Sequence, residues 1–423
     1  MKKRFTSAAV AAAAALVLAG CSGGSGGEGG DAMEFWHNST TGDGKAYWEE
    51  AAAAFEEETG TAIRISSIQN EDMDGKLQTA ANSGDMPDVF MARGGGKLAD
   101  IVEAGLVKDL SDLIDDDVRE AYGDAVFSAF TIDGAEYGMP VAVLPGGMFY
   151  SEDLFAEAGI AETPTTIEEL EGAVDELRDA GVEPIALGAK DAWPAAHWFY
   201  FFALRACGQE TIEQISTSLD FGDGCWLDAA EDLAAFAETE PFNEGFLTTS
   251  AQQGAGSSAG LVANHKAAME LMGGWNVGVI ASLTPDGEPL ADLSWFPFPA
   301  TSGGEGDPTA MMGGVDGFAC AADAPPACEE FLNFIAQTEW QEKYVEAFQT
   351  IPASKEAQSA VTDPALQPIM AAYNDAAYVV VWLDTLLGQN VGNALNTAVV
   401  EMLAGQGSPE QLVETAAQAA ERG

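Results

Sequence analysis

The stretch AMEFWHNSTTGDGKAYWEEAAAAFEEETG, residues 32–60, decides the fold class. Its apolar alternation at 33–36 predicts a short strand, and the turn residues at 38–44 predict a loop. A helix is predicted over 45–58, because Trp48 and Phe55 fall on one apolar face of a 3.6-residue period. A strand followed by a loop and a helix is the first half of a βαβ unit.

The same order continues along the chain. Residues 61–68 alternate as a strand does, residues 74–83 predict a helix, and PDVFMA at 87–92 predicts a third strand. After RGGG, the segment KLADIVEAG at 97–105 predicts another helix. Strands that alternate with helices predict a parallel sheet with covering helices, and hence an α/β fold.

Polar side chains stand where these predicted strands end. Trp36, His37 and Asn38 stand at the end of the first strand, Asn70 and Glu71 follow the second, and Arg93 follows the third. Ligands of parallel α/β sheets bind outside the carboxyl ends of the strands. We therefore expect these strand ends to face a common site, with Trp36, His37, Asn70, Glu71 and Arg93 as ligand-binding residues.

Tryptophans with polar neighbours supply further candidates. The string WPAAHWFYFF holds Trp193 and His197 four residues apart, on one face of a helix, and MGGWN places Trp275 and Asn276 after a tight Gly-Gly turn. Sugars have apolar ring faces and hydroxyl rims, so their sites combine flat aromatic rings with polar groups. These residues are typical of a sugar site, although core packing stays an alternative for Trp193.

One further residue is a candidate for the same site, and three aromatic side chains are expected in the core instead. GGVDGF places Asp316 after two glycines, where the chain returns toward its first part. The apolar side chains Trp198, Phe201 and Phe202 predict core packing.

Composition excludes several classes of partner. Of 423 residues, 47% are hydrophobic, so the chain is long enough and apolar enough for two domains or one large bilobal unit. It carries 68 acidic and 17 basic residues, a formal net charge of −51. A surface this negative repels nucleic acid and anionic lipid headgroups.

The first residues predict export. Lys2, Lys3 and Arg4 precede an unbroken apolar run at 8–18, which is the order of a secretory signal peptide over residues 1–20. The run ends at LAGC, which resembles the lipobox of bacterial lipoproteins, in which the cysteine, here Cys21, is lipidated. Residues 21–32 then predict a flexible glycine-rich linker.

The cysteines that remain after Cys21 are even in number. Cys207, Cys225, Cys320 and Cys328 allow three pairings in an exported chain, and we favour the local one, 207–225 with 320–328. Zinc-type spacings such as C-x-x-C are absent from the sequence, so no metal and no cofactor are predicted.

One string resembles a catalytic motif. GSSAG at 256–260 matches G-x-S-x-G, but no acidic residue lies between it and His265, the last histidine. We predict a turn of small residues there and no catalytic residue.

Taken together, these segments resemble a known family. The lipobox, the WHNS opening, QNEDMDGKLQTAANSGDMPDVF, YGMPVAVLPGGMFYSEDLF, MGGWN and GGVDGF are similar to extracellular sugar-binding lipoproteins of bacterial ABC importers, the class that includes maltose-binding protein. The resemblance covers essentially the whole mature chain. It implies a two-lobe periplasmic-binding-protein-like α/β fold with a hinge, between whose lobes the chain crosses more than once. With the composition breaks, we expect lobe 1 over 33–143 and 310–355, and lobe 2 over 144–309 and 356–423.

The resemblance also implies a site and a function. It carries over the candidates above and adds Trp382, Asp384 and Asn390 in the C-terminal segment. It implies a monomeric, lipid-anchored binding protein outside the cytoplasmic membrane, not an enzyme, that delivers a neutral oligosaccharide to an ABC permease. A di- to tetrasaccharide is expected, and ARGGGKLADIV resembles members assigned to α-galactosides or xylo-oligosaccharides. The alternatives are an anchored glycoside hydrolase and a wall-binding lectin-like protein.

Overall fold

The computed structural model describes residues 32–422, so the predicted signal peptide, Cys21 and the linker up to residue 31 lie outside the described residues. The first part of the chain alternates as predicted, in elements whose bounds are β1 (Met33–His37), α1 (Gly42–Thr59), β2 (Ile63–Ser67), α2 (Asn70–Ser83), β3 (Val89–Ala92) and α3 (Gly95–Glu103). Strand β1 pairs in parallel with both β2 and β3, which confirms the α/β prediction.

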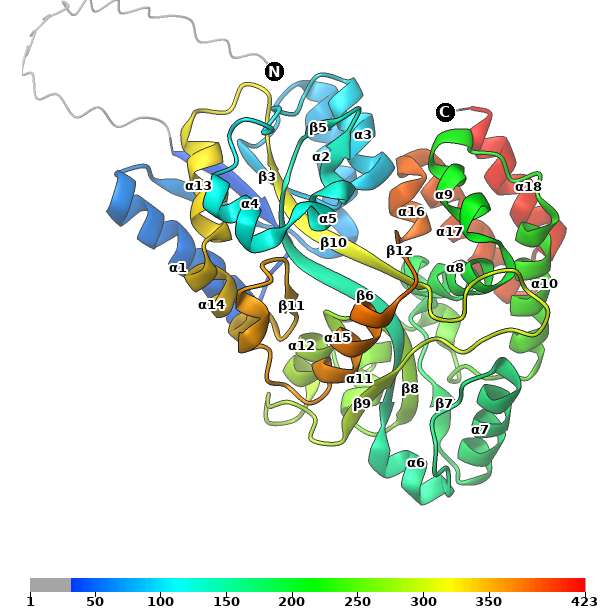
Figure 1. The fold of residues 1–423 in the computed structure, drawn as a ribbon. Helices are drawn as coiled ribbons and strands as arrows, with labels where there is room; N and C mark the ends of the chain where they lie inside the picture. Colours follow the sequence, from blue (N-terminus) through cyan, green and yellow to red (C-terminus); the bar gives the residue numbers. More distant parts are fainter. Residues whose placement is uncertain (1–31, 423) are drawn as a thin grey trace, which may run out of the picture. The chain divides into compact units, whose positions relative to one another are not determined.

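The sheet is mixed rather than purely parallel. Its order is β2-β1-β3-β10-β6-β8-β7, with β6 (Met139–Ser151), β7 (Glu183–Ile185), β8 (Ala267–Gly273) and β10 (Met311–Cys320). Strand β10 runs antiparallel to both β3 and β6, and β6 runs antiparallel to β8. The long strands β6 and β10 pass side by side through the middle of the fold (Figure 1).

Strand β6 changes its partners at Pro145. Up to Pro145 it pairs with β10 and β11 (Ile351–Pro352), and from Gly146 onward it pairs with β8 and β9 (Leu293–Phe296). Proline has no backbone N–H to give to a ladder, so it fits the point where one ladder ends. One continuous strand therefore belongs to two strand arrangements.

Three short strands complete this part of the fold. Strand β12 (Val379–Val381) pairs with β10, in a tail expected to be helical from about residue 359. Strands β4 (Thr131–Ile132) and β5 (Ala135–Glu136) form a separate hairpin.

Helices cover the sheet. Between β3 and β10 they are α4 (Asp116–Tyr122), α5 (Asp124–Phe127), α6 (Glu152–Ala158), α7 (Ile167–Asp179), α8 (Trp193–Ala206), α9 (Gln209–Ser218), α10 (Gly224–Glu238), α11 (Ser258–Ala263) and α12 (Asn276–Leu283). After β10 they are α13 (Ala327–Ala336), α14 (Thr338–Phe348), α15 (Leu366–Asp375), α16 (Leu383–Leu386), α17 (Gly388–Leu403) and α18 (Pro409–Ala420). Helix α7 begins with an N-cap at Thr166, whose hydroxyl accepts a hydrogen bond from the Glu169 backbone amide.

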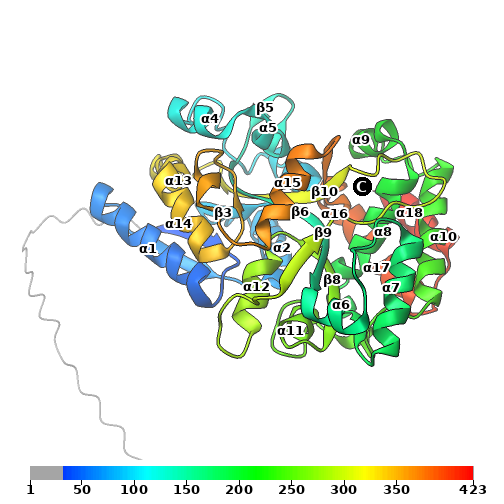
Figure 2. The same cartoon turned by 60° about the horizontal axis from the view of Figure 1, so that its bottom comes forward.

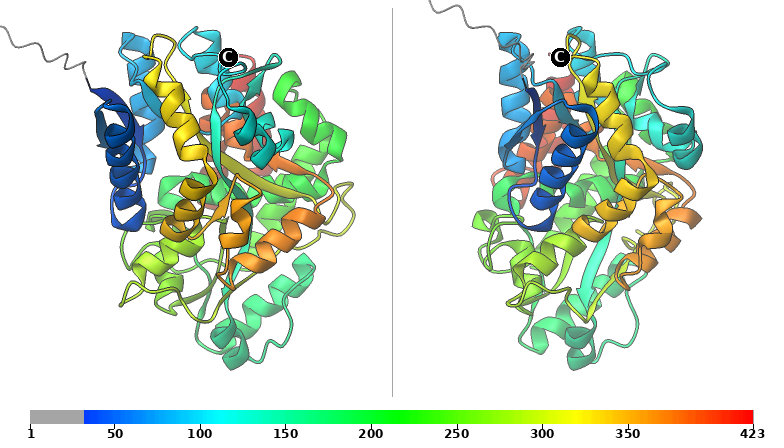
Figure 3. Two further views of the ribbon diagram at one scale, coloured as in Figure 1. Left: turned by 60° about the vertical axis from the view of Figure 1, so that its left-hand side comes forward. Right: turned by 90° about the vertical axis from the view of Figure 1, so that its left-hand side faces the viewer.

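Two hydrophobic cores form on the two parts of the sheet. In the first, Phe35 of β1 packs edge-on against Trp48, Phe318 and Phe331, beneath α1, α13 and α14, which lie together in Figure 3. In the second, α8 packs against α10 and α17, with α18 beside them (Figure 2). The predicted core residues Trp198, Phe201 and Phe202 are fully buried there.

The cysteines pair as predicted. One disulfide joins Cys207 to Cys225, with their Cα atoms 5.0 Å apart, and the other joins Cys320 to Cys328, with their Cα atoms 6.0 Å apart. The first ties the end of α8 to the start of α10, and the second ties β10 to α13. Each bridge closes a short loop, which limits the freedom of the unfolded chain.

The segment GSSAG has its own structure. Its last three residues begin α11, and the Ser257 hydroxyl accepts from the Gly260 amide as the N-cap. The prediction of a plain turn is therefore wrong at this point, because the serine side chain caps a helix.

Candidate functional site: a cavity with two unlike walls

A cavity of about 640 Å³ opens beside the long strands β6 and β10. Its lining draws on both cores and comprises Asn38, Asn70, Glu71, Asp74, Gly75, Gln78, Arg93, Lys97, Leu144, Lys190, Asp191, Ala192, Trp193, His197, Gln252, Trp275, Gly314, Asp316, Trp382, Asp384, Thr385, Gln389, Asn393, Asn396 and Thr397. This volume lies in the range of ordinary small-molecule sites.

One side of the cavity is aromatic. Trp193, His197, Trp275 and Trp382, which we call the aromatic wall, come from α8, the start of α12 and the start of α16. The His197 ring stacks on Trp382 with centroids 4.0 Å apart and planes 10° apart. Trp275 lies 6.0 Å from Trp382 and 6.1 Å from Trp193, both at steep angles. The tilted rings form a concave apolar surface rather than one flat plane.

Glycines allow these rings to lie directly on the backbone. A Cβ atom on Gly273 would stand 2.0 Å from the Trp275 ring, and one on Gly146 would stand 2.3 Å from the Trp382 ring. Contacts that short do not occur, so any larger residue at either glycine would displace a tryptophan. Gly273 and Gly146 therefore determine how closely the Trp275 and Trp382 rings approach the backbone.

Burial keeps the histidine of this wall neutral. His197 is 3% exposed, and burial lowers its pKa to about 4, although the Asp384 carboxylate acts in the opposite direction. A neutral imidazole stacked on indole behaves as one more ring of the wall.

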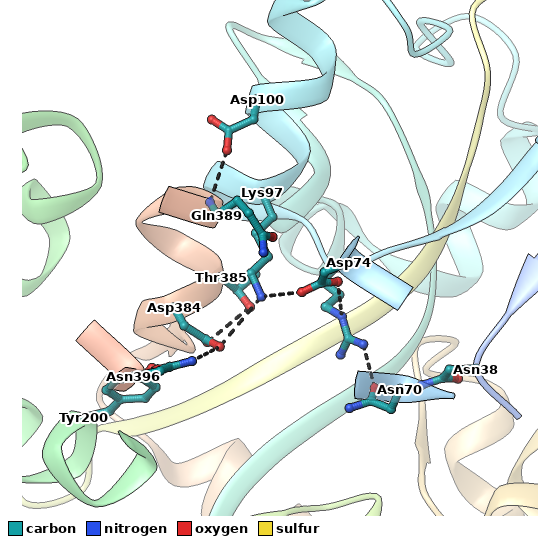
Figure 4. A network of polar contacts seen from close by, with 11 residues as sticks. Asn38, Asn70, Asp74, Lys97, Asp100, Tyr200, Asp384, Thr385, Gln389 and Asn396 are labelled. Carbon is teal, nitrogen blue, oxygen red and sulfur yellow. Dashed lines mark hydrogen bonds and ion pairs between the residues drawn. The ribbon is translucent and has the colours of Figure 1, made fainter. Parts of the chain in front are cut away.

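Another part of the cavity lining is charged. Asn70, Asp74, Arg93, Lys97 and Asp384, which we call the charged wall, hold one another in a chain of contacts (Figure 4). The Arg93 guanidinium donates to Asn70 Oδ1 over 2.7 Å and lies 3.7 Å from Asp74 Oδ1. Lys97 Nζ lies 2.9 Å from Asp74 Oδ2 and 3.7 Å from Asp384 Oδ2.

The chain of contacts extends beyond these five residues at both ends. At one end, the Asn38 amide donates to Asn70 Oδ1 over 3.2 Å. At the other, the Asn396 amide donates to Asp384 Oδ2 over 3.2 Å, and Tyr200 bonds to Asn396 (Figure 4). These hydrogen bonds therefore fix the orientation of the polar side chains that line the cavity.

Mutual pairing sets the charge states of this wall. Burial raises the pKa of Asp74, but Arg93 and Lys97 lower it by more, so it lies below its ordinary value. Burial lowers the pKa of Arg93, but the surrounding carboxylates, Asp74 foremost, raise it by more. Burial raises the pKa of Asp316, in spite of Arg93. The wall therefore presents fixed charges at neutral pH.

Lys97 and Asp384 of the charged wall lie on segments that contact each other at the edge of the cavity. The start of α3 approaches α16 and α17 so closely that a Cβ atom on Gly96 would stand 2.5 Å from the Leu386 carbonyl oxygen and from the Gly388 nitrogen. Nearby, the backbone N–H of Gln389 donates to the Asp100 carboxylate over 3.2 Å (Figure 4). Elsewhere on the rim, Gln253 donates to Glu71 over 3.0 Å.

Most of the residues predicted from the sequence line this cavity. They are Asn70, Glu71, Arg93, Trp193, His197, Trp275, Asp316, Trp382 and Asp384. Although they come from six separate segments, the fold brings them to one place, and ligand contact stays a prediction for each.

Trp36 and His37 do not line the cavity. Strand β1 alternates, so His37 shares the inward face with Met33 and Phe35, where burial lowers its pKa to about 4. Trp36 points to the other face, and its indole N–H donates to Glu34 over 2.9 Å. Of the three residues at this strand end, only Asn38 lines the cavity.

Asn276 and Asn390 do not line it either. Asn276 is fully buried at the start of α12, where its amide donates to Glu270. Asn390 is exposed on α17, off the face that carries Gln389 and Asn393 into the cavity. A polar residue next to a tryptophan is thus a weaker indication of a cavity-lining residue than the tryptophan itself.

Sequence reasoning missed several lining residues that have visible signals. Asp74 lies four residues after Asn70 on α2, so helical spacing places both on one face. Lys97 stands at the start of the helix predicted over 97–105, and it pairs with Asp74. The run Gln389, Asn393, Asn396 and Thr397 follows the same helical spacing along α17.

Among residues 32–422, no group of three or more His, Cys, Asp or Glu side chains is arranged to hold a metal ion. In the same part of the chain, every helix is too short or too polar to cross a membrane.

Similar proteins are known. An uncharacterized ABC transporter extracellular-binding protein of Pyrococcus horikoshii is 25% identical over 341 residues, which cover 78% of this chain and 74% of that protein. A structure described under xylan utilization by the thermophilic bacterium Caldanaerobius polysaccharolyticus is 25% identical, with a TM-score of 0.84, and covers 92% of this chain and 99% of that one. A chitin oligosaccharide binding protein is 24% identical, with a TM-score of 0.83 over 93% of this chain and 99% of that one.

These neighbours bear out the predicted two-lobe periplasmic-binding-protein-like fold. Residues 38–342 match the family described as bacterial extracellular solute-binding protein, a range that includes most of the sheet and the greater part of the cavity lining. The chain belongs to the family of bacterial extracellular solute-binding proteins.

Proposed function

We propose that this protein captures a neutral di- to tetrasaccharide in the cavity and delivers it intact to the permease of an ABC importer. The observation that carries the proposal is the pairing of an aromatic wall with a wall of fixed polar groups across about 640 Å³. Sugar rings present apolar C–H faces, which stack on indole, and hydroxyl rims, which bond to carboxylates, amides and guanidinium groups. Trp193, Trp275 and Trp382 supply the first kind of surface, and the charged wall with Asp316 supplies the second.

Charge supports a neutral ligand. The lysine and arginine of the charged wall already pair with Asp74 and Asp384, so neither is left to balance an anionic group. Among the described lining residues, this leaves Lys190, which is exposed, as the one lysine or arginine without an ion pair. The chain as a whole carries a net charge of −51, which disfavours anionic ligands further.

The relatives narrow the class of sugar. The chitin oligosaccharide binding protein and the structure described under xylan utilization are similar over nearly the whole described chain. Together with the resemblance of ARGGGKLADIV, they support xylo-oligosaccharides, chito-oligosaccharides and α-galactosides as the first ligands to test.

Two lobes that close around the sugar complete the proposal. We infer lobe 1 over 33–143 and 310–355, and lobe 2 over 144–309 and 356–423. The change of partners along β6 at Pro145 supports a boundary there. Export with lipidation at Cys21, a monomeric state and binding without cleavage belong to the same proposal, which the family membership supports.

Calorimetric titration of the purified protein with xylotriose, N,N′,N″-triacetylchitotriose and raffinose tests it. We expect saturable binding of at least one sugar, and chromatography of the same samples should recover that sugar unchanged. Cleavage would identify a hydrolase instead. A protein that binds none of these sugars, nor a wider panel of oligosaccharides, would refute the proposal. Labelling of the expressed lipoprotein with a fatty-acid analogue, with Cys21→Ser as the control, tests the anchor.

A further inference from the structure

A buried carboxyl group lies behind the aromatic wall. Glu270 lies within β8, three residues before its end, and is 1% exposed. Asn276, the first residue of α12, is fully buried, and its amide nitrogen donates to Glu270 Oε2 over 2.8 Å. The pair therefore joins the strand to the helix on either side of Trp275.

The other oxygen of each side chain has no partner. Glu270 Oε1 and Asn276 Oδ1 are both buried, and neither has a hydrogen-bond partner among the described residues. Both atoms are acceptors when the carboxyl group is ionised, and buried acceptors without a donor are rare in folded proteins. A proton on Glu270 Oε1 would supply the missing donor: in the planar pairing of a carboxylic acid with an amide, the acid O–H donates to the amide oxygen while the amide nitrogen donates to the other acid oxygen, as Asn276 does to Glu270 Oε2. Carboxylic acid and amide then form a ring of two hydrogen bonds.

The surroundings favour the protonated form. Burial raises the pKa of Glu270 to about 7, although the nearby Ser258 hydroxyl and the Asn276 amide act in the opposite direction. The Ser258 hydroxyl donates its hydrogen bond to the Ala251 carbonyl oxygen over 2.9 Å, so it leaves Glu270 Oε1 without a donor. Strands β6 and β7 and helices α8 and α11 pack against β8. Their titratable side chains are Tyr150, Glu183, His197, Tyr200 and Arg205, and none of these charges is among the causes of the shift.

The pair acts on the ligand site through Trp275. Trp275 is the N-cap residue of α12, its carbonyl accepts from the Val279 amide over 3.3 Å, and its ring lies on Gly273, the last residue of β8. Anything that releases the first residue of α12 from β8 therefore moves the backbone that carries the Trp275 ring.

We propose that Glu270 is a positioning residue: in its protonated form it holds Asn276 by two hydrogen bonds and thereby fixes Trp275 in the aromatic wall. Ionisation leaves a single hydrogen bond and a buried charge, and the start of α12 then loosens. This inference rests on the proposed function only in so far as Trp275 contacts a sugar.

The test compares Glu270→Gln with the wild-type protein. Glutamine keeps the shape of the carboxylic acid, donates to Asn276 Oδ1 from its amide nitrogen, and does not ionise. For whichever of xylotriose, triacetylchitotriose or raffinose binds, we expect the wild-type Kd to rise about tenfold from pH 6 to pH 8, as the competent fraction falls. The Kd of the Gln variant should stay flat. Glu183→Gln, on the neighbouring strand β7, is the matched control and should keep the wild-type pH dependence.

A measurement without ligand separates the two proposals. Tryptophan fluorescence of the unliganded wild-type protein should show a transition centred near pH 7, which Glu270→Gln abolishes and Glu183→Gln retains. If no sugar binds, the proposed function fails and the fluorescence alone decides this inference. A transition that persists in Glu270→Gln, or a wild-type Kd that is the same at pH 6 and pH 8, would overturn it.

Discussion

The two walls of the cavity are built on opposite principles. In the charged wall, Asp74 holds both Arg93 and Lys97, so each group is fixed by the charge of its neighbours. In the aromatic wall, rings are fixed by shape, and the indole N–H groups of Trp193 and Trp382 are buried without a partner among the described residues. A change in the charged wall should therefore alter the electrostatics of the site and the pH dependence of stability, whereas a change in the aromatic wall should alter packing and the contact area with a ligand.

The largest effect is expected from Trp275→Ala. The ring is half-buried at the cavity, and loss of its apolar contact with a sugar, about 1.5–3 kcal/mol, should weaken binding by about one to two orders of magnitude. Titration calorimetry and thermal melting of the same sample measure the affinity and the stability separately.

Trp226→Ala is the matched control for this prediction. Trp226 is fully buried in α10, away from the cavity lining, and its loss should cost about 3–5 kcal/mol of stability without changing the affinity of the folded fraction. If Trp275→Ala behaved as this control does, the ring would be structural and the aromatic wall would lose its proposed role.

Gly96→Ala tests the contact of α3 with α16 and α17. The added methyl group would stand 2.5 Å from backbone atoms of Leu386 and Gly388, and overpacking of this kind costs about 1–3 kcal/mol. We expect lower stability together with weaker sugar binding, because α3 must move away from α16 and α17. Gly172→Ala, in open space on α7, should instead stabilise by about 0.5–1 kcal/mol. Unchanged affinity in Gly96→Ala would mean that this contact does not shape the site.

Asp74→Asn tests the charged wall through pH. The pKa of Asp74 is below its ordinary value of 3.8 in the folded protein, so its ionised form stabilises the fold above that pH. We expect Asp74→Asn to lower the free energy of unfolding by about 1–2 kcal/mol at pH 7. The difference from the wild type should shrink as the pH falls below 3.8 toward the folded pKa. Urea denaturation at several pH values measures it, and Asp72→Asn, exposed on the same helix, is the control. A difference that is independent of pH would contradict the argument.

The smallest effect is expected from Trp36→Phe. Trp36 lies outside the cavity and donates one hydrogen bond to Glu34, so its replacement should cost about 0.5–1.5 kcal/mol of stability. Sugar affinity should be unchanged within error. Weaker binding would show that the site extends past the cavity and would restore the interpretation of Trp36 as a ligand-binding residue.

Much of the fold was predictable because its signals are local. The alternation of strand and helix from β1 to α3 follows from spacing and composition within short segments. The sequence left three pairings of the four cysteines open, and the local pairing that we favoured is the one that forms. Strand β12 was not predictable, since three valines become a strand only when β10 offers them a ladder. The start of α11 was missed for a similar reason, because a serine cap is visible only once the backbone has turned.

The same distinction between local signals and tertiary contacts applies to the candidate site. The sequence by itself determined which kinds of side chain are present: tryptophans next to glycines, and polar residues at strand ends. Only the tertiary structure decided which of them share the cavity. Strand alternation points His37 into the core, whereas Asn38 lines the cavity. Asn276 is buried because its side chain hydrogen-bonds to Glu270. The physical reason is that a side chain's direction depends on its position in the pleat or helical turn, and its burial depends on which distant segment packs against it.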